Sequence, residues 1–248
     1  MSDRGQAEGE PRLRIERLHA GYGRAEILHG VTLSLDVGQS LCLVGPNGAG
    51  KSTVLNAIFG LADVREGSIR VDGRALETRS HPSLRMEGFG IAYVLQETSV
   101  FPDLSVEQNL RLGAYRLRDA AQVNERVEHV FATHPRLAER RRSQARVLSG
   151  GERRILEIAR ALMMKPRLLL IDEPSIGLEP RAVVEVFEML RSRQHSEGLS
   201  VLLVEQNVRQ GLRFADVGCV LVGGRVAISA PAQDLLGDGS IADLFLNR

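Results

Sequence analysis

The fold of this chain is decided by the stretch Gly45-Pro46-Asn47-Gly48-Ala49-Gly50-Lys51-Ser52-Thr53. An apolar strand, Leu41–Val44, runs into this stretch, and a helical stripe that begins at Val54 runs out of it. Glycines at a strand-to-helix turn let successive backbone N–H groups face inward around a polyphosphate, and the helix N-terminus adds its positive end. In such a loop Lys51 reaches the β- and γ-phosphates and the Ser52 hydroxyl is a magnesium ligand. The stretch therefore predicts a binding site for a nucleoside triphosphate.

Composition indicates a globular protein and argues against nucleic acid as a partner. The 248 residues are 43% hydrophobic and 25% charged, with a net charge of +1. A polyanionic backbone usually selects a clearly basic protein. Aromatic residues make up only 4% and Trp is absent, which removes the stacking platforms of a single-strand binder.

Three further features favour a cytoplasmic location. Cys42 and Cys219 lie inside apolar runs far apart in sequence, so we expect buried, reduced thiols. Apolar stretches fall short of the about 20 residues that span a bilayer. The opening residues 1–11 are polar and read as a disordered tail without a signal peptide. We expect residues 12–248 to form one domain, held at a membrane only by another protein.

Alternating strand and helix patterns predict an α/β fold with a mainly parallel core sheet covered on both faces. Residues 102–147 differ, because strand-forming residues are rare there. Ser105 and Gln108 make a capping box that opens a helix, and a second helix ends before Pro135. We therefore expect a helical lobe inserted into the core. After it, Val217–Val222 and Arg225–Ile228, joined by two glycines, predict a hairpin.

Two carboxylates end the apolar run Leu168–Ile171. In open α/β folds ligands lie at the carboxyl edge of the parallel strands, so Asp172 and Glu173 should face the phosphate loop. We expect Asp172 to hold the magnesium shell. Glu173 is then free to orient or deprotonate water, a role typically worth about 10²–10⁴ in rate.

The run Leu148-Ser149-Gly150-Gly151-Glu152 predicts a second anion site. Ser149 and Glu152 are explained as a capping box at a helix start. Two adjacent glycines are not explained in this way, because each costs a helix about 1 kcal/mol relative to Ala. Accessible N–H groups at a helix start suit an anion.

In combination these motifs resemble an ATP-binding cassette (ABC) ATPase. The phosphate loop, Gln96, Leu148–Glu152, the acidic strand end and Ser175–Leu178 follow one another in that family's order. The resemblance covers Leu13–Arg248. It implies a P-loop NTPase core, an N-terminal antiparallel β subdomain and the inserted helical lobe.

The resemblance also implies roles for single residues. Two cassettes meet head to tail, and each ATP with its Mg²⁺ lies between one chain's phosphate loop and the other's signature run. Ser149, Gly150 and Gly151 would then touch the γ-phosphate of the partner's ATP. Gln96 would sense Mg²⁺ and the attacking water, and Tyr22 would stack on adenine.

Within the family the chain looks like the second ATPase subunit of branched-chain amino-acid importers (LivF type). The resemblance is carried by Phe131, His134–Arg141, Ala161–Met163 and Leu203–Asn207. It implies a second ABC ATPase subunit, two membrane permease subunits and a substrate-binding protein as partners, with this subunit on the inner face of the cell membrane. Urea and short-amide importers use nearly the same subunit, so the cargo stays open.

Other classes of P-loop protein fit the sequence less well. A P-loop kinase or a GTPase would leave the signature run without a role, and the Asn-Lys-x-Asp guanine reader of GTPases is absent from the sequence. A cassette that serves DNA repair would need a long coiled-coil insertion, which does not fit here. An ABC ATPase of iron–sulfur assembly remains an alternative.

Three positions depart from the family pattern. Gln206, which we expect to act in catalysis, stands where most cassettes place a His that contacts the γ-phosphate, a change that LivF-type subunits share. Leu95 precedes Gln96 where Pro is common, which predicts a less rigid loop. Glu179 replaces the Ala that is usual in LivF-type chains.

Overall fold

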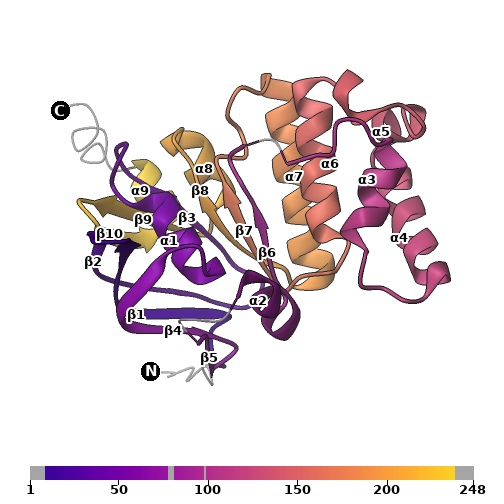
Figure 1. The fold of residues 1–248 in the computed structure, drawn as a ribbon. Coiled ribbons are helices and arrows are strands. Elements are labelled where there is room, and N and C mark those ends of the chain that lie inside the picture. Colours follow the sequence, from indigo (N-terminus) through magenta and orange to yellow (C-terminus); the bar gives the residue numbers. More distant parts are fainter. Residues whose placement is uncertain (1–8, 78–80, 98, 238–248) are drawn as a thin grey trace, which may run out of the picture.

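An antiparallel sheet formed mainly by the N-terminal strands lies at one end of the molecule (Figure 1). The computed structural model describes residues 9–77, 81–97 and 99–237. The strand order of this sheet is β2-β1-β4-β5. Its strands are β1 (Leu13–Tyr22), β2 (Ala25–Leu35), β4 (Asp63–Val71) and β5 (Arg74–Ala75). The predicted tail falls mostly outside the described residues, which begin at Gly9.

The second sheet has the order β10-β9-β3-β8-β7-β6, with all pairs parallel except β10 on β9. The fold class is confirmed, and so is the C-terminal hairpin. The strands of this sheet are β3 (Ser40–Val44), β6 (Ile91–Val94), β7 (Leu168–Asp172), β8 (Ser200–Val204), β9 (Val217–Val222) and β10 (Arg225–Pro231).

Two hydrophobic cores cover the two faces of the parallel sheet. Side chains alternate between faces along a strand, so Leu168 and Leu170 join one core while Leu169 and Ile171 join the other. The first core lies between this sheet, the antiparallel sheet and α1 (Lys51–Phe59). This two-sided burial explains why the parallel strands read as continuous apolar runs.

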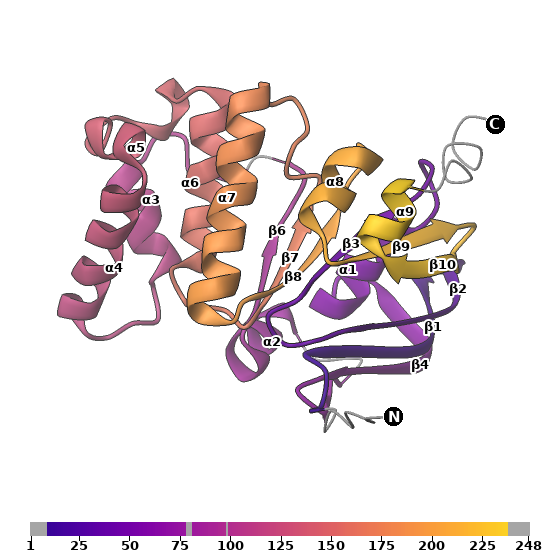
Figure 2. The same ribbon diagram turned by 180° about the vertical axis from the view of Figure 1, so that it is seen from behind.

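The other core is shared with a group of helices on the far side of the sheet. Figure 2 shows α6 and α7 side by side between the parallel sheet and α3 and α4. The predicted capping box of Ser105 and Gln108 opens α3 with both of its hydrogen bonds. The helices of this region are α3 (Val106–Gly113), α4 (Ala120–Thr133), α5 (Pro135–Glu139), α6 (Gly150–Leu162) and α7 (Pro180–Glu197).

The remaining helices are short and flank the sheets. They are α2 (Pro82–Phe89), α8 (Val208–Phe214) and α9 (Ala232–Gly237). Cys42 and Cys219 are buried free thiols, as expected. In residues 9–77, 81–97 and 99–237, none of the helices has the length and apolar character that crossing a membrane requires.

Candidate functional site

Four parallel strands end at one edge of the second sheet. Val204 of β8 is in register with Leu43 of β3 and with Asp172 of β7, and Val94 of β6 is in register with Ile171. Ligands of open α/β sheets bind at this edge. The segments that follow these four strands carry many of the predicted site residues: Gly45–Thr53, Gln96, Glu173 and Gln206.

The phosphate loop Gly45–Thr53 connects β3 to α1 in a conformation that requires glycine at two points. A Cβ atom on Gly45 would lie 2.2 Å from the carbonyl oxygen of Leu221. Gly50 is the N-cap of α1 with a φ of 98°, and a Cβ there would lie 2.8 Å from Leu28. Because Gly50 has no side chain to cap the helix, the first N–H groups of α1 are available to an anion.

Lys51 is the buried cation of this loop. Its Nζ donates hydrogen bonds to the carbonyl oxygens of Gly45, at 2.8 Å, and Pro46, at 3.1 Å. Burial lowers the pKa of Lys51, and the nearby carboxylates of Glu173 and Asp172 oppose that shift. The ammonium group is thus placed between the loop and the acidic strand end, where a phosphate chain would need a counter-charge.

Asp172 and Ser52 meet beside the phosphate loop. The carboxylate of Asp172 accepts a side-chain hydrogen bond from Ser52, and burial raises the pKa of Asp172. Within the part of the chain that the structure describes, Oδ1 of Asp172 is buried without a hydrogen-bond partner. Mg²⁺ prefers oxygen ligands from carboxylates and hydroxyls. The donor set of this pair therefore fits the predicted magnesium ion.

Glu173 is held in an uncommon backbone conformation at the end of β7. Its φ is 48°, and its N–H donates to the carbonyl oxygen of Val204 at 2.9 Å. Gln96 Nε2 donates to Glu173 Oε2 at 2.9 Å. Burial raises the pKa of Glu173, the neighbouring Asp172 raises it further, and Lys51 opposes the rise. A carboxylate with a raised pKa and a fixed orientation is suited to act as a base.

A buried ion pair on α6 reaches both sides of this site. The guanidinium of Arg154 donates to the carbonyl oxygens of Leu95, at 2.9 Å, and Asp172, at 2.8 Å. It also pairs with Glu157 at 3.0 Å. Glu157 in turn accepts a hydrogen bond from the backbone N–H of Ser99 at 2.6 Å. Arg154 therefore anchors the segment at Leu95, where the family's usual Pro is missing.

The signature run lies at the start of α6. Ser149 caps this helix, and Glu152 completes the predicted capping box. Gly151 is also required by packing, which the sequence alone does not show, because a Cβ there would lie 2.6 Å from the Cβ of Ala182 on α7. A Cβ on Gly150 would meet nothing nearer than Leu178 at 3.9 Å. Packing thus explains the second glycine but not the first, which is exposed.

Tyr22 ends β1 with 43% of its surface exposed. Its hydroxyl accepts a hydrogen bond of 2.7 Å from Asn56 Nδ2, and Asn56 Oδ1 accepts one of 3.2 Å from Tyr93. Asn56 belongs to α1, the helix that leaves the phosphate loop. The ring is thus fixed beside α1 with an exposed surface, as a base-stacking residue needs.

Gln206 follows β8 and lines a cavity of about 410 Å³ together with Glu173. Its neighbour Glu205 is buried, and Glu205 accepts hydrogen bonds from Ser175 N, at 3.0 Å, and Ser175 Oγ, at 2.9 Å. These bonds tie the segment after β7 to the end of β8. The other residues that line the cavity are Ser175, Ile176, Leu178, Pro180, Val183, Glu205, Asn207 and Gln210.

Three residues that support the site were not predicted: Arg154, Glu157 and Glu205. The sequence carried a signal for Glu205, because it directly follows the apolar run Val201–Val204, as Asp172 follows Leu168–Ile171. For Arg154 and Glu157, a charged pair three residues apart on an otherwise apolar helix face was available as a signal.

Comparison with known proteins identifies the family of this chain. Residues 28–176 match the family described as ABC transporter. The chain belongs to this family. It is an ABC ATPase, which binds a nucleotide. The expected fold and the expected family are confirmed.

Relatives of this ABC ATPase include transport proteins of similar length. It is 38% identical to the high-affinity branched-chain amino acid transport ATP-binding protein BraG of Pseudomonas aeruginosa, over 94% of this chain and 99% of the relative. It is 39% identical to the probable branched-chain amino acid transport ATP-binding protein LivF of Archaeoglobus fulgidus, over 90% and 94% respectively.

Solved structures of cassettes have the same fold. The ADP conformation of an ATP-binding cassette of an ABC transporter superposes with a TM-score of 0.82 at 25% identity. The match covers 96% of this chain and 100% of that one.

Proposed function

We propose that this ABC ATPase drives an importer of branched-chain or other hydrophobic amino acids. Both relatives described above are branched-chain amino acid transport proteins, and each match extends over most of both chains. The proposal for how this chain hydrolyses ATP rests on the hydrogen bond between Gln96 and Glu173 at the end of β7. This bond places the amide of Gln96 beside the carboxylate of Glu173, and Lys51 is close enough to affect the pKa of that carboxylate.

In the proposed hydrolysis the chain's own groups have separate tasks. The N–H groups of the phosphate loop and Lys51 bind the β- and γ-phosphates. Gln96 positions a water molecule, and Glu173 accepts its proton as the water attacks the γ-phosphate. The raised pKa of Glu173 favours that proton transfer, because burial makes the carboxylate a better base.

We propose Ser52, Asp172 and Gln96 as the residues that hold Mg²⁺. Bound there, the ion would neutralise charge on the β- and γ-phosphates. The partnerless Oδ1 of Asp172 supports this assignment. Burial raises the pKa of Asp172, while Ser52, Lys51 and Arg154 oppose that rise and so favour the ionised form that binds a cation.

A second ABC ATPase subunit would complete each ATP site. Ser149 and Gly150 are exposed at the start of α6, and a helix N-terminus with free N–H groups attracts phosphate. Because Ser149 already accepts from Glu152 N, it would offer its hydroxyl proton to the γ-phosphate of the partner's ATP.

A groove next to the Gln96 segment suits a cytoplasmic segment of a permease. Its volume is about 410 Å³, and it is lined by residues of α2, β6, α3 and α6. Phe101, Leu112 and Tyr115 expose between 41% and 59% of their surfaces there. Ser99 and Glu157 also line it, so an occupant would press on the ion pair that holds Leu95 and Asp172.

This arrangement would place the chain in the cytoplasm, on the inner face of the cell membrane, with two permease subunits and a substrate-binding protein as further partners. The test is uptake by proteoliposomes that contain the transporter purified with this chain. Uptake of leucine, isoleucine or valine that requires ATP and Glu173 is the expected result. Uptake of urea or acetamide instead would refute the cargo class. Failure of the chain to co-purify with any permease would favour the iron–sulfur assembly alternative.

A further inference from the structure

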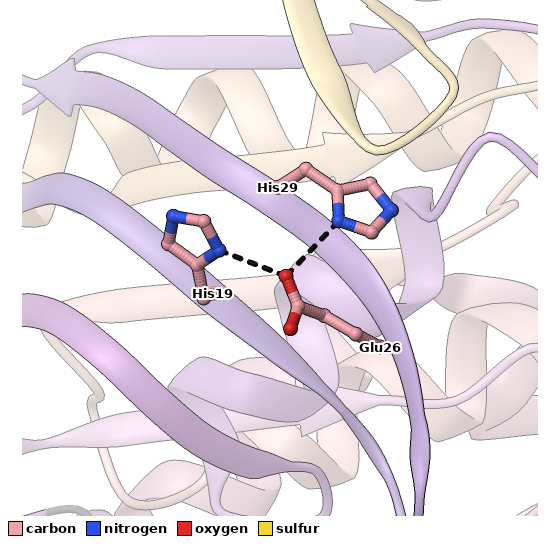
Figure 3. Close-up of side chains that lie close together, drawn as sticks. All are labelled: His19, Glu26 and His29. Carbon is pink, nitrogen blue, oxygen red and sulfur yellow. Dashed lines mark hydrogen bonds and ion pairs between the residues drawn. The ribbon is translucent and has the colours of Figure 1, made fainter.

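Two histidines and one glutamate, none of them assigned to the ATP site, face one another across the first two strands. His19 lies on β1, and Glu26 and His29 lie on β2, where His29 is the register partner of His19. Figure 3 shows both imidazole rings directed at the same carboxylate oxygen. Oε1 of Glu26 lies 2.8 Å from His19 Nδ1 and 3.0 Å from His29 Nδ1.

We propose that His19, Glu26 and His29 form a binding site for a divalent transition metal ion, with zinc as the best match. Imidazole nitrogens and carboxylate oxygens are zinc ligands, and two His with one Glu is a known protein donor set with a fourth position left for water. Carboxylate and water alone would suit Mg²⁺ or Ca²⁺, but two imidazoles shift the preference towards zinc and its neighbours.

The distances suit this ion after a small adjustment. Bonds of about 2.0–2.1 Å to a tetrahedral zinc place neighbouring ligand atoms roughly 3.3 Å apart. The present separations from Glu26 Oε1 are 2.8 and 3.0 Å, and all three donor atoms lie within 4.8 Å of one another. Side-chain rotations can adjust these separations, because the three side chains are between 30% and 36% exposed. The same exposure gives an ion a path of entry.

One neighbouring side chain competes with a metal ion for the carboxylate of Glu26. Arg65 lies 3.7 Å from Glu26 Oε2, so zinc must compete with a loose ion pair for this carboxylate. In residues 9–77, 81–97 and 99–237, no other three His, Cys, Asp or Glu side chains bring their donor atoms so close. The two cysteines are fully buried, which keeps their thiols from capturing the ion.

Backbone hydrogen bonds connect this site to the phosphate loop. The N–H of His29 donates to the carbonyl oxygen of Gly224 at 2.8 Å, and the N–H of Gly224 donates to the carbonyl oxygen of Ala49 at 3.0 Å. Tyr22 ends the strand that carries His19. An ion that links β1 to β2 would therefore stabilise the positions of Tyr22 and of the phosphate loop at Ala49.

The test is isothermal titration of the metal-free, tag-free chain with zinc chloride in the absence of nucleotide. One tightly bound equivalent is expected, with a higher melting temperature. His19→Ala, His29→Ala and Glu26→Gln should each weaken zinc binding by more than the roughly 10- to 100-fold that loss of an outer-shell partner costs. His195→Ala is the matched control, because this exposed histidine lies on α7 and should leave zinc binding unchanged.

Anomalous diffraction at the zinc edge on the unaltered chain provides an assignment that needs no variant. A single peak between His19, Glu26 and His29 would support the proposal. A peak elsewhere, or zinc affinity that survives the loss of both histidines, would overturn it. Binding weaker than millimolar would show that the cluster is only an ion-paired group.

Discussion

The side-chain amide of Gln96 donates a hydrogen bond of 2.9 Å to the carboxylate of Glu173. The two residues follow β6 and β7, which are adjacent parallel strands, so the sheet register brings them together. This bond orients the carboxylate, while burial and the neighbouring Asp172 raise its pKa. Orientation and basicity are therefore set by different neighbours and can be tested separately.

Glu173→Gln should keep nucleotide binding and reduce turnover by about 10²–10⁴, the usual worth of a general base. The amide has the same size but cannot accept the proton of water. Steady-state phosphate release and ATP binding by calorimetry measure the two effects. Glu125→Gln is the matched control, because Glu125 is exposed on α4, outside the segments that carry the site. Wild-type turnover in Glu173→Gln would remove Glu173 from the role of base.

Lys51→Ala should weaken ATP binding roughly 10- to 150-fold, since a hydrogen bond to a charged group is worth about 1.5–3 kcal/mol. The loop loses the cation that its own carbonyl groups now hold. Lys165→Asn is the control. Lys165 has a φ of 49°, which Asn tolerates, and should leave affinity unchanged. Unaltered affinity in Lys51→Ala would refute the assignment of the phosphate loop.

Much of this site follows from local patterns, because strand, turn and helix signals around Lys51 and Asp172 depend on nearby residues only. The capping box of Ser149 and Glu152 is local in the same way and is confirmed. Contacts between distant segments could not be predicted. Arg154 meets Leu95 only because α6 packs beside β6, and Gly151 meets Ala182 only because α6 packs beside α7.

We expect the ion pair between Arg154 and Glu157 to stabilise the fold, and the hydrogen bonds of Arg154 to two carbonyl oxygens to support turnover. Arg154→Met leaves Glu157 buried without its partner, which should cost about 3–5 kcal/mol of unfolding free energy. Adding Glu157→Leu should recover most of that loss, because two apolar side chains replace two charges. Turnover should stay low in the double variant, since Met cannot bond to the carbonyl oxygens of Leu95 and Asp172.

Chemical denaturation and phosphate release are measured on the unaltered chain, on Arg154→Met and on the double variant. Together they show whether Arg154 only stabilises the fold or also positions the site. A double variant that recovers both stability and turnover would reduce the pair to a packing element. Low turnover at recovered stability, with an unchanged KM for ATP, is the result expected of a positioning residue.

Ser149→Arg should abolish hydrolysis and spare nucleotide binding to the single chain, because Ser149 would act on the ATP of a second subunit. Loss of the helix cap is a second effect of this change, worth about 1 kcal/mol. Ser149→Asp separates the two effects, since Asp caps a helix but repels the γ-phosphate, and it should be equally inactive. Ser149→Thr should remain active.

Specific activity gives an independent check of the shared site. If two copies of this chain form it, activity per chain should rise with concentration until dimers dominate. Constant specific activity, together with an active Ser149→Asp variant, would contradict a site that two chains share.

Gln206 offers a way to change the catalytic rate without touching the base. Gln can donate only a neutral hydrogen bond, whereas a His near its ordinary pKa donates from a charged ring. The charged bond is roughly twice as strong, so we expect Gln206→His to raise turnover about fivefold with little change in ATP affinity. The gain should grow as pH falls towards 6.5, because more of the imidazole is then protonated. Gln210→His, in the same cavity, should show neither effect.

The expected direction rests on the hypothesis that this site is the slower of two in a heterodimer whose other subunit keeps its His. Gln206→Ala should then be mild compared with Glu173→Gln, because it removes one neutral donor and leaves the base oriented by Gln96. ATPase assays on the reconstituted transporter, run from pH 6 to pH 8, measure Gln206→His, Gln206→Ala, Glu173→Gln and the Gln210→His control together. If Gln206→Ala were as inactive as Glu173→Gln, Gln206 would be a full catalytic partner and the slow-site hypothesis would fail.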